Sequence, residues 1–131
     1  MNSNKYKDIY YIDSGVEELK YSDFKINKKK IILKKKNNNL NGLVIVYAPW
    51  CKHCKEIVDT WSELAIENMY RFYIASINSE DLKNKNDHIT SKLKVIEYPT
   101  LFSIKKSGLL TKYVGSISRD DIQYHISINS L

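Results

Sequence analysis

Two cysteines separated by two residues are the groups in this chain best suited to redox chemistry. Cys51 and Cys54 are its only cysteines, so they form a local pair and not a long-range staple. The pair follows an apolar stretch and opens a segment with helical periodicity, which would place the first sulfur at a helix N-terminus. Backbone N–H groups and the positive end of the helix stabilise a thiolate there. We therefore expect Cys51 to be the nucleophile and Cys54 to be the shielded, resolving thiol.

Cationic side chains surround the pair. His53 lies between the two cysteines, and Lys52 and Lys55 flank them. Positive charge close to Cys51 favours its thiolate and therefore stabilises the reduced form of the pair. This arrangement predicts a comparatively oxidising disulfide.

Other uses of the two cysteines have less support. A structural zinc site needs four ligands, but there is no second cysteine pair, and His88 and His125 lie in unrelated segments. We expect these two histidines to be surface or hydrogen-bonded residues. Covalent haem attachment needs a histidine directly after the second cysteine, where this chain has Lys55. Two buried cysteines without a role remain as an alternative, and we expect neither a metal nor a cofactor.

The hydrophobic pattern indicates which elements position the thiols. Residues 43–47 are continuously apolar, as in a central strand covered on both faces. Residues 72–77 predict a second buried strand. Between them, apolar residues recur with helical spacing from near Cys51, at Ile57, Trp61, Leu64, Ala65 and Met69. A strand, a helix and a strand in succession predict a right-handed parallel crossover that starts at the cysteine pair.

The flanking segments predict smaller elements. We expect a loosely held arm over 1–15, a short strand at 16–20, a hairpin from 23–26 and 31–33, a short helix carrying Ile89, Leu93 and Ile96 that ends before Pro99, and a second hairpin from 100–105 and 109–114. The tail supports two interpretations. Alternation at Ile122, Tyr124, Ile126 and Ile128 is typical of a strand, whereas residues 118–121 have the form of a capping box that begins a helix.

Three segments together carry a resemblance to a known family. The run Tyr47-Ala48-Pro49-Trp50-Cys51-Lys52-His53-Cys54-Lys55 resembles the active-site signature of thioredoxin-fold proteins, closest to the protein disulfide isomerase branch. Residues 95–102 resemble the family's cis-proline segment, and residues 113–122 resemble its last strand and last helix. The resemblance implies an α/β thioredoxin-like domain over 16–131, with a mixed central β-sheet of four to five strands and helices on both faces. It also implies that the tail is a helix.

The resemblance assigns roles residue by residue. Cys51 resembles the attacking nucleophile and Cys54 the resolving thiol, with His53 as the third member of the catalytic group. Trp50, Lys52, Tyr98 and Pro99 are expected to contact the substrate, with Pro99 as the cis-proline. The implied function is thiol-disulfide exchange with cysteines of protein substrates. A redox-inactive thioredoxin-fold binding module is the alternative.

The sequence also departs from the family pattern. A buried acid is usual six residues before the first cysteine, where this chain has Ile45, and its usual lysine partner on the next strand is Ser76. The proline that usually bends the active-site helix is Asp59. An arginine used by the isomerases near the last loop falls at Ile117, with Arg119 close by. The missing acid would slow proton transfer at Cys54 or leave it to water.

Composition limits the remaining possibilities. The chain has 131 residues and a mass of 15.3 kDa, which fits one domain. No apolar run approaches the roughly 18 residues of a membrane span, and no secretory signal peptide is visible, so we expect a cytoplasmic or virion location. Nineteen lysines against two arginines indicate an A/T-rich genome such as that of a large DNA virus. Residues 20–36 hold the excess positive charge, but no readout motif accompanies them, so nucleic-acid binding is not expected.

Overall fold

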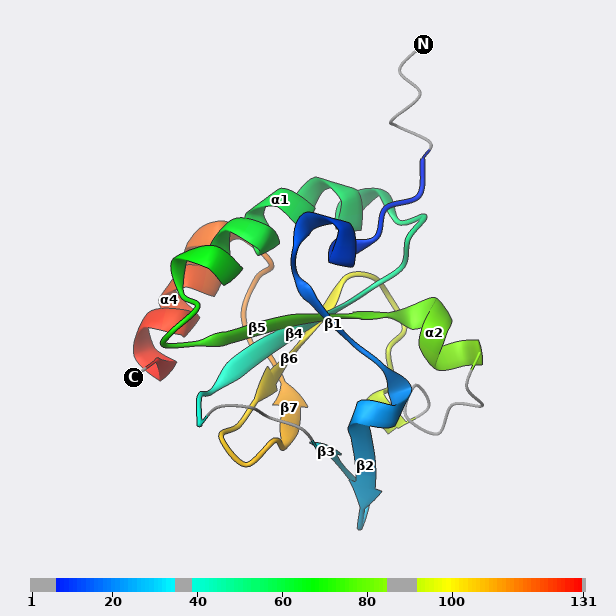
Figure 1. Cartoon of the computed structure of the whole chain (residues 1–131), viewed down its shortest axis with the longest axis vertical. Coiled ribbons are helices and arrows are strands. Elements are labelled where there is room, and N and C mark those ends of the chain that lie inside the picture. Colours follow the sequence, from blue (N-terminus) through cyan, green and yellow to red (C-terminus); the bar gives the residue numbers. More distant parts are fainter. Residues whose placement is uncertain (1–6, 35–38, 85–91, 131) are drawn as a thin grey trace.

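The sheet that positions the cysteine pair is built around β4 (Gly42–Tyr47), whose six residues are all buried. β4 pairs in parallel with β5 (Tyr73–Asn78) and antiparallel with β6 (Thr100–Ile104). The computed structural model describes residues 7–34, 39–84 and 92–130, without the side chains of 82–84, and its main sheet has the strand order β1-β5-β4-β6-β7 (Figure 1). The predicted parallel neighbours and the mixed five-stranded sheet are therefore confirmed.

The predicted smaller strands and the two hairpins are also present. The remaining elements, in chain order, are η2 (Tyr11–Ser14), β1 (Glu17–Leu19), η3 (Tyr21–Asp23), β2 (Phe24–Asn27), β3 (Lys30–Leu33), α1 (Lys52–Glu67), α2 (Ser79–Asn84), β7 (Leu110–Lys112) and α4 (Arg119–Asn129). β1 pairs in parallel with β5, and β7 pairs antiparallel with β6. Among the described residues, no helix has the length and apolar character that crossing a membrane requires.

The side chains of β4 alternate between two hydrophobic clusters, because successive residues of a strand point to opposite faces of the sheet. Leu43, Ile45 and Tyr47 pack in the cluster covered by α1 and α4. Val44 and Val46 pack in the second cluster, which the β2–β3 hairpin covers. Figure 1 shows α1 and α4 together on one side and β2, β3 and β7 on the other. Such two-sided burial explains why the strand reads as a continuous apolar run.

Helix α1 buries one face against the sheet and ends earlier than the sequence pattern predicted. Trp61 is fully buried, and its Nε1 donates a hydrogen bond to the carbonyl of Ala75 at 3.0 Å. Asn68 caps the helix, and its side-chain amide donates to the carbonyl of Leu64 at 2.9 Å. Met69 therefore lies outside the helix and is exposed, so its assignment to the buried face was wrong.

The C-terminal tail forms helix α4, as the capping box predicted. Ser118 is the N-cap, and its hydroxyl accepts a hydrogen bond from the backbone N–H of Asp121 at 3.2 Å. Ile122 and Ile126 are buried, one turn apart, whereas Tyr124 and Ile128 are exposed. The alternating apolar pattern of the tail thus does not correspond to a strand.

The β2–β3 hairpin forms a separate two-stranded sheet that is attached to the β6–β7 turn. The backbone N–H of Leu33 donates to the carbonyl of Gly108 at 2.9 Å, and a bridge joins Ile32 to Leu109. A Cβ atom at position 108 would lie 2.5 Å from the Leu33 carbonyl oxygen, so only glycine permits this approach. The hairpin is thereby held against the second hydrophobic cluster.

The N-terminal segment packs more tightly than the loose arm expected for 1–15. Tyr11 is fully buried, and its ring stacks on that of Tyr47 with centroids 4.3 Å apart. The backbone N–H of Ile9 donates to the carbonyl of Pro49 at 2.9 Å, beside the cysteine pair. The expectation was therefore wrong at Ile9 and Tyr11, because nothing local in the sequence indicates the aromatic partner that buries Tyr11. Residues 1–6 lie outside the described part of the chain.

The helix expected before Pro99 is only partly within the described residues. Lys92 and Leu93 are helical, and Leu93 is buried, but Ile89 lies outside the described ranges. Ile96 is 93% exposed, so it is not part of a buried helical face. This exposed side chain lies three residues before Pro99.

Candidate active site

Cys51 is the N-cap of helix α1 and follows the end of β4 after the loop residues 48–50. Its Sγ accepts a hydrogen bond from the backbone N–H of Cys54 at 3.2 Å. The residue is 7% exposed, so a small part of it reaches the surface. This N–H belongs to the first helical turn, where it has no acceptor within the helix, and the positive end of the helix also lies at this sulfur. The sequence predicted such a position for the attacking thiol.

Cys54 lies one turn into α1 and is completely buried. Burial is the main cause that raises the pKa of its thiol, and the hydrogen bond with Cys51 raises it further. Both cysteines are free thiols in this structure. The pair thus consists of one cysteine that keeps a small exposure and one that is fully buried, and such a difference suits stepwise disulfide exchange.

The loop before β6 lies against the first sulfur. The Tyr98–Pro99 peptide bond is cis, and Cys51 Sγ donates, as a thiol, to the carbonyl oxygen of Tyr98 at 3.5 Å. The rings of Trp50 and Tyr98 meet edge to face with centroids 5.9 Å apart. Two segments nearly fifty residues apart in the chain therefore meet at Cys51.

The other predicted site residues lie around this centre with different exposure. Trp50 is exposed, and its Nε1 donates to Glu80 Oε1 at 3.1 Å. Lys52 and His53 are exposed in the first turn of α1, and Lys55 is half-buried. Trp50 and Tyr98 thus meet beside Cys51, and the exposed Lys52 and His53 follow it in the first turn of α1, whereas Cys54 and Pro99 are buried.

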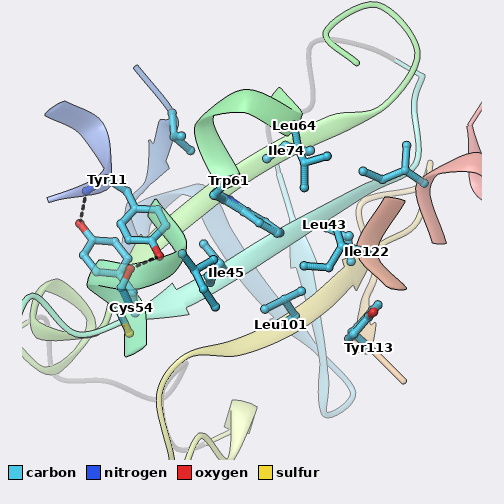
Figure 2. Close-up of a cluster of buried hydrophobic side chains, with 14 of the residues drawn as sticks. Tyr11, Leu43, Ile45, Cys54, Trp61, Leu64, Ile74, Leu101, Tyr113 and Ile122 are labelled. Carbon is cyan, nitrogen blue, oxygen red and sulfur yellow. Dashed lines mark hydrogen bonds between the residues drawn. The ribbon is translucent and has the colours of Figure 1, made fainter. Parts of the chain in front are cut away.

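A hydrogen-bonded pair of tyrosines lies behind Cys54, and the sequence analysis missed it. Tyr11 donates its hydroxyl to the carbonyl oxygen of Cys54 at 2.7 Å (Figure 2). The hydroxyl of Tyr47 accepts from the backbone N–H of Tyr11 at 3.2 Å and donates to Glu18 Oε1 at 2.5 Å. The side chain of Glu18 is only 5% exposed. Burial raises the pKa of both tyrosines above the usual range, so both hydroxyls stay protonated.

The position of the missing acid is occupied by a tightly packed apolar side chain. Ile45 is fully buried in the cluster that contains Cys54, near it in Figure 2. Its register partner on β5 is Ser76, also buried, and the Ser76 hydroxyl donates to the carbonyl of Glu17 at 3.2 Å. The two positions are thus neighbours in the sheet, and neither carries a charge that could act on Cys54.

Arg119 and His125 are engaged away from the thiols. The Arg119 guanidinium binds Glu63 at 3.0 Å and Glu67 at 2.9 Å, which connects α4 to α1. His125 contacts the rings of Phe72 and Tyr113, and burial lowers its pKa. His88 lies outside the described residues. Within the parts of the chain that the structure describes, no cluster of three or more histidine, cysteine or acidic side chains could hold a metal ion.

Comparison with known proteins identifies the family. Residues 21–128 match the thioredoxin family. The chain is 36% identical over 112 residues to protein disulfide-isomerase TMX3 of Mus musculus, which covers 82% of this chain and 21% of that protein. It is 35% identical over 91 residues to a protein disulfide-isomerase of Datisca glomerata, covering 68% and 17%. It is 34% identical over 101 residues to MPD1, a protein disulfide-isomerase of Saccharomyces cerevisiae, covering 77% and 29%.

The strand order, the cysteine pair at the start of α1 and the matched residues lead to one conclusion: the chain belongs to the thioredoxin family. Its relatives named protein disulfide-isomerase support oxidoreductase chemistry at the level of the family. The chain spans less than a third of the length of each of these relatives.

Proposed function

We propose that this protein exchanges the Cys51–Cys54 disulfide with cysteines of protein substrates. The observation that carries the proposal is the contrast between the two sulfurs. Cys51 is 7% exposed at a helix N-terminus and accepts a backbone hydrogen bond, whereas Cys54 is fully buried. Such a pair can attack with one sulfur and resolve with the other.

The reductive direction proceeds in two balanced steps. The Cys51 thiolate attacks one sulfur of a substrate disulfide, forming a mixed disulfide and releasing the other substrate sulfur as a thiolate. Cys54 then loses its proton to water, and its thiolate attacks Cys51 Sγ; the Cys51–Cys54 bond forms as the bond to the substrate sulfur breaks, which releases the second substrate thiolate. The protein leaves with a Cys51–Cys54 disulfide, and the substrate has gained two electrons. The reverse sequence, starting from the protein disulfide, oxidises a substrate dithiol.

The surroundings of Cys51 suit a bound polypeptide. Trp50 and Tyr98 present aromatic surface beside the sulfur, and the Tyr98 carbonyl faces it. Pro99 has no N–H, so the backbone of Tyr98 can pair with an extended substrate strand as an added β-strand would. Lys52 and His53 are exposed and follow Cys51 in the first turn of α1. We assign substrate contact to Trp50, Lys52, Tyr98 and Pro99, and support of the thiolate to His53.

Single-cysteine variants test the order of attack. Cys51→Ser should abolish reduction of insulin by the protein in the presence of dithiothreitol. Cys54→Ser should accumulate mixed disulfides with substrate, visible on a non-reducing gel and removed by excess reductant. The double variant Cys51→Ser/Cys54→Ser serves as the control for non-covalent association. Trapping by Cys51→Ser in place of Cys54→Ser would reverse the assignment.

A redox-inactive binding module is the second candidate, and Ile45 and Ser76 favour it. Without a charged group beside Cys54, the resolving step lacks an internal proton acceptor. A protein of this class would bind its partner equally well with both cysteines replaced, and its wild-type form would not reduce insulin above the rate of dithiothreitol alone.

Location sets the direction of electron flow. We keep the cytoplasm or a virus particle as the proposed location. In a reducing cytoplasm the pair would rest as a dithiol and reduce its substrates, whereas in an oxidising particle it would transfer disulfides.

A further inference from the structure

A cavity rimmed by lysines lies on the face of the sheet away from α1 and α4, where Figure 1 shows β2, β3 and β7 together. Its volume is about 290 Å³. Four of its lining residues are Lys29 and Lys30 of the β2–β3 hairpin, Lys92, and Lys112 at the end of β7. Three segments that are distant in sequence thus converge with the same charge, and among the described residues no acidic side chain lines the cavity.

The floor of this cavity is apolar. Ile31, Leu93, Phe102 and Leu110 line it and belong to the second hydrophobic cluster. A concave apolar surface of this size, close to the lower limit of roughly 300 Å³ for ligand sites, can bury one aromatic or aliphatic side chain. The apolar floor and the cationic rim together suit a ligand in which an apolar group is flanked by negative charges.

Within the part of the chain that the structure describes, no ion pair neutralises the rim lysines. Across residues 7–34, 39–84 and 92–130, the ion pairs involve Lys20 and Arg119, and none involves the four rim lysines. An incoming carboxylate would therefore not have to displace an existing partner within this part of the chain.

The cavity continues toward the cysteine pair. A second cavity of about 280 Å³ shares Leu93, Phe102 and Lys112 with the first and is also lined by Glu97 and Thr100. These last two residues flank Tyr98 and Pro99, and the Tyr98 carbonyl bonds Cys51 Sγ. A groove thus runs from the cis-proline loop to the lysine rim. Hereafter we call these two joined cavities the lysine groove.

We propose that the lysine groove binds an acidic segment of the protein substrate, with one apolar side chain on its floor, while a cysteine of that substrate reacts at Cys51. The proposal rests on the function proposed above. Glu97 argues against a nucleic acid, because a continuous polyanion following the groove would pass a carboxylate at the end nearest the thiols. A peptide can place a neutral or basic residue there and its acidic residues at the rim.

The hairpin turn offers a matched pair of variants. Lys28 and Lys29 both have positive φ, 50° and 70°, a conformation in which glycine is preferred. Only Lys29 lines the groove, so replacing either lysine by glycine should leave the fold intact. The rim variant is Lys29→Gly/Lys112→Gln. The control is Lys28→Gly/Lys34→Gln, which removes the same charge from exposed positions outside the groove.

The probe is a fluorescein-labelled, cysteine-free peptide with the core Asp-Glu-Phe-Asp-Glu, compared with its Asn-Gln-Phe-Asn-Gln counterpart. Fluorescence anisotropy on the full reduced protein measures binding without redox chemistry. We expect the rim variant to weaken binding of the acidic peptide about tenfold, equal to about 1.4 kcal/mol, and the control variant less than twofold. Equal weakening by both variants, or equal binding of the neutral peptide, would overturn the proposal. So would displacement of the peptide by single-stranded oligothymidylate at lower concentrations than unlabelled peptide requires.

A second pair of variants tests the apolar contribution without disturbing the core. Ile96 lines the groove and Val114 does not, and both side chains are almost fully exposed. Ile96→Ser should weaken binding of the acidic peptide when an apolar residue precedes its core, and Val114→Ser should not. Equal effects of the two variants would contradict a groove that extends to the cis-proline loop.

Reduction of the neutral disulfide bis(2-hydroxyethyl) disulfide separates the two proposals. The rim variant should retain wild-type rates on this substrate, because its substitutions lie away from the thiols. If the wild-type protein binds the acidic peptide but does not reduce this disulfide, the proposed redox function fails and the groove stands as a binding site. If it reduces the disulfide but does not distinguish the two peptides, the groove proposal fails alone.

Discussion

Removing the hydroxyl of Tyr47 should destabilise the protein far more than removing that of Tyr11, although the two rings stack on each other. The Tyr47 hydroxyl serves two buried partners, the backbone N–H of Tyr11 and the carboxylate of Glu18. Glu18 is 5% exposed at its side chain, and its other polar partner among the described residues is Lys20 Nζ at 3.5 Å. Tyr47→Phe therefore leaves a buried donor without an acceptor and a buried carboxylate with one distant partner.

The magnitudes follow from these partners. A buried donor left unpaired costs about 1–3 kcal/mol, and a hydrogen bond to a charged group contributes about 1.5–3 kcal/mol. Allowing for water entering at Glu18, we expect Tyr47→Phe to lower the free energy of unfolding by about 3 kcal/mol. Tyr11→Phe removes one hydroxyl from the Cys54 carbonyl, which as a helical carbonyl keeps its backbone partner. Its expected cost is about 1 kcal/mol.

Urea unfolding in reducing buffer measures both values, with the fluorescence of buried Trp61 as the signal. At a slope of roughly 1.5 kcal/mol per molar urea, Tyr47→Phe should shift the midpoint by about 2 M. The exposed Tyr70 provides the matched control, since Tyr70→Phe should cost less than about 0.5 kcal/mol. The double variant Tyr47→Phe/Glu18→Gln should be at least as stable as Tyr47→Phe alone, because no unpaired charge remains buried. A cost for Tyr47→Phe below that for Tyr11→Phe would refute this reasoning.

Three further outcomes are expected. Burial lowers the pKa of His125, so below about pH 6.5 this histidine is protonated more in the unfolded chain than in the folded protein. The free energy of unfolding should therefore fall as the pH drops from 7 to 5. Urea titrations should show a weaker dependence on pH for His125→Gln. Arg119→Ala should cost less than about 1 kcal/mol, because its ion pairs with Glu63 and Glu67 are exposed, and insulin reduction should be unchanged if the arginine only connects the helices. Equilibration with glutathione should give the Cys51/Cys54 couple a reduction potential of about −180 mV, well above a value of about −270 mV. His53→Ala should lower this potential by about 10–20 mV. A wild-type potential below about −260 mV would contradict the argument that cationic side chains stabilise the Cys51 thiolate.

The elements nearest the chemistry were predictable because their signals are local. The continuous apolar run of residues 43–47 indicates a strand that is covered on both faces of the sheet, and helical spacing of apolar residues begins shortly after it. The position of Cys51 at the start of a helix therefore followed from about twenty residues of sequence. Local signals did not settle the tail, because its apolar residues alternate as in a strand while residues 118–121 have the form of a capping box. The resemblance to the thioredoxin family decided for a helix, and in the structure the Ser118 hydroxyl caps that helix by accepting a hydrogen bond from the N–H of Asp121.

The contacts behind Cys54 could not be predicted, because they join segments that are distant in sequence. Tyr11 lies 43 residues from Cys54 and 36 from Tyr47, and nothing in a tyrosine-rich stretch distinguishes the ring that becomes buried. The one available signal was general: a buried tyrosine hydroxyl needs a partner. The burial of the Glu18 side chain was even harder to predict, since an acid on a short edge strand is usually solvated.

The absence of a charged group beside Cys54 links the site to the lysine groove. Burial raises the pKa of the Cys54 thiol, and the side chains near it are the apolar Ile45 and the protonated Tyr11, neither of which accepts a proton. If the proposed exchange takes place, we therefore expect deprotonation of Cys54 to limit the resolving step and the mixed disulfide on Cys51 to live longer than it would beside a buried carboxylate. A long-lived mixed disulfide would give a second cysteine of the substrate time to attack, which would rearrange disulfides without using Cys54. Such rearrangement requires that the substrate stay oriented while one of its sulfurs is held, and the proposed binding in the lysine groove would supply that orientation through contacts that do not involve either thiol.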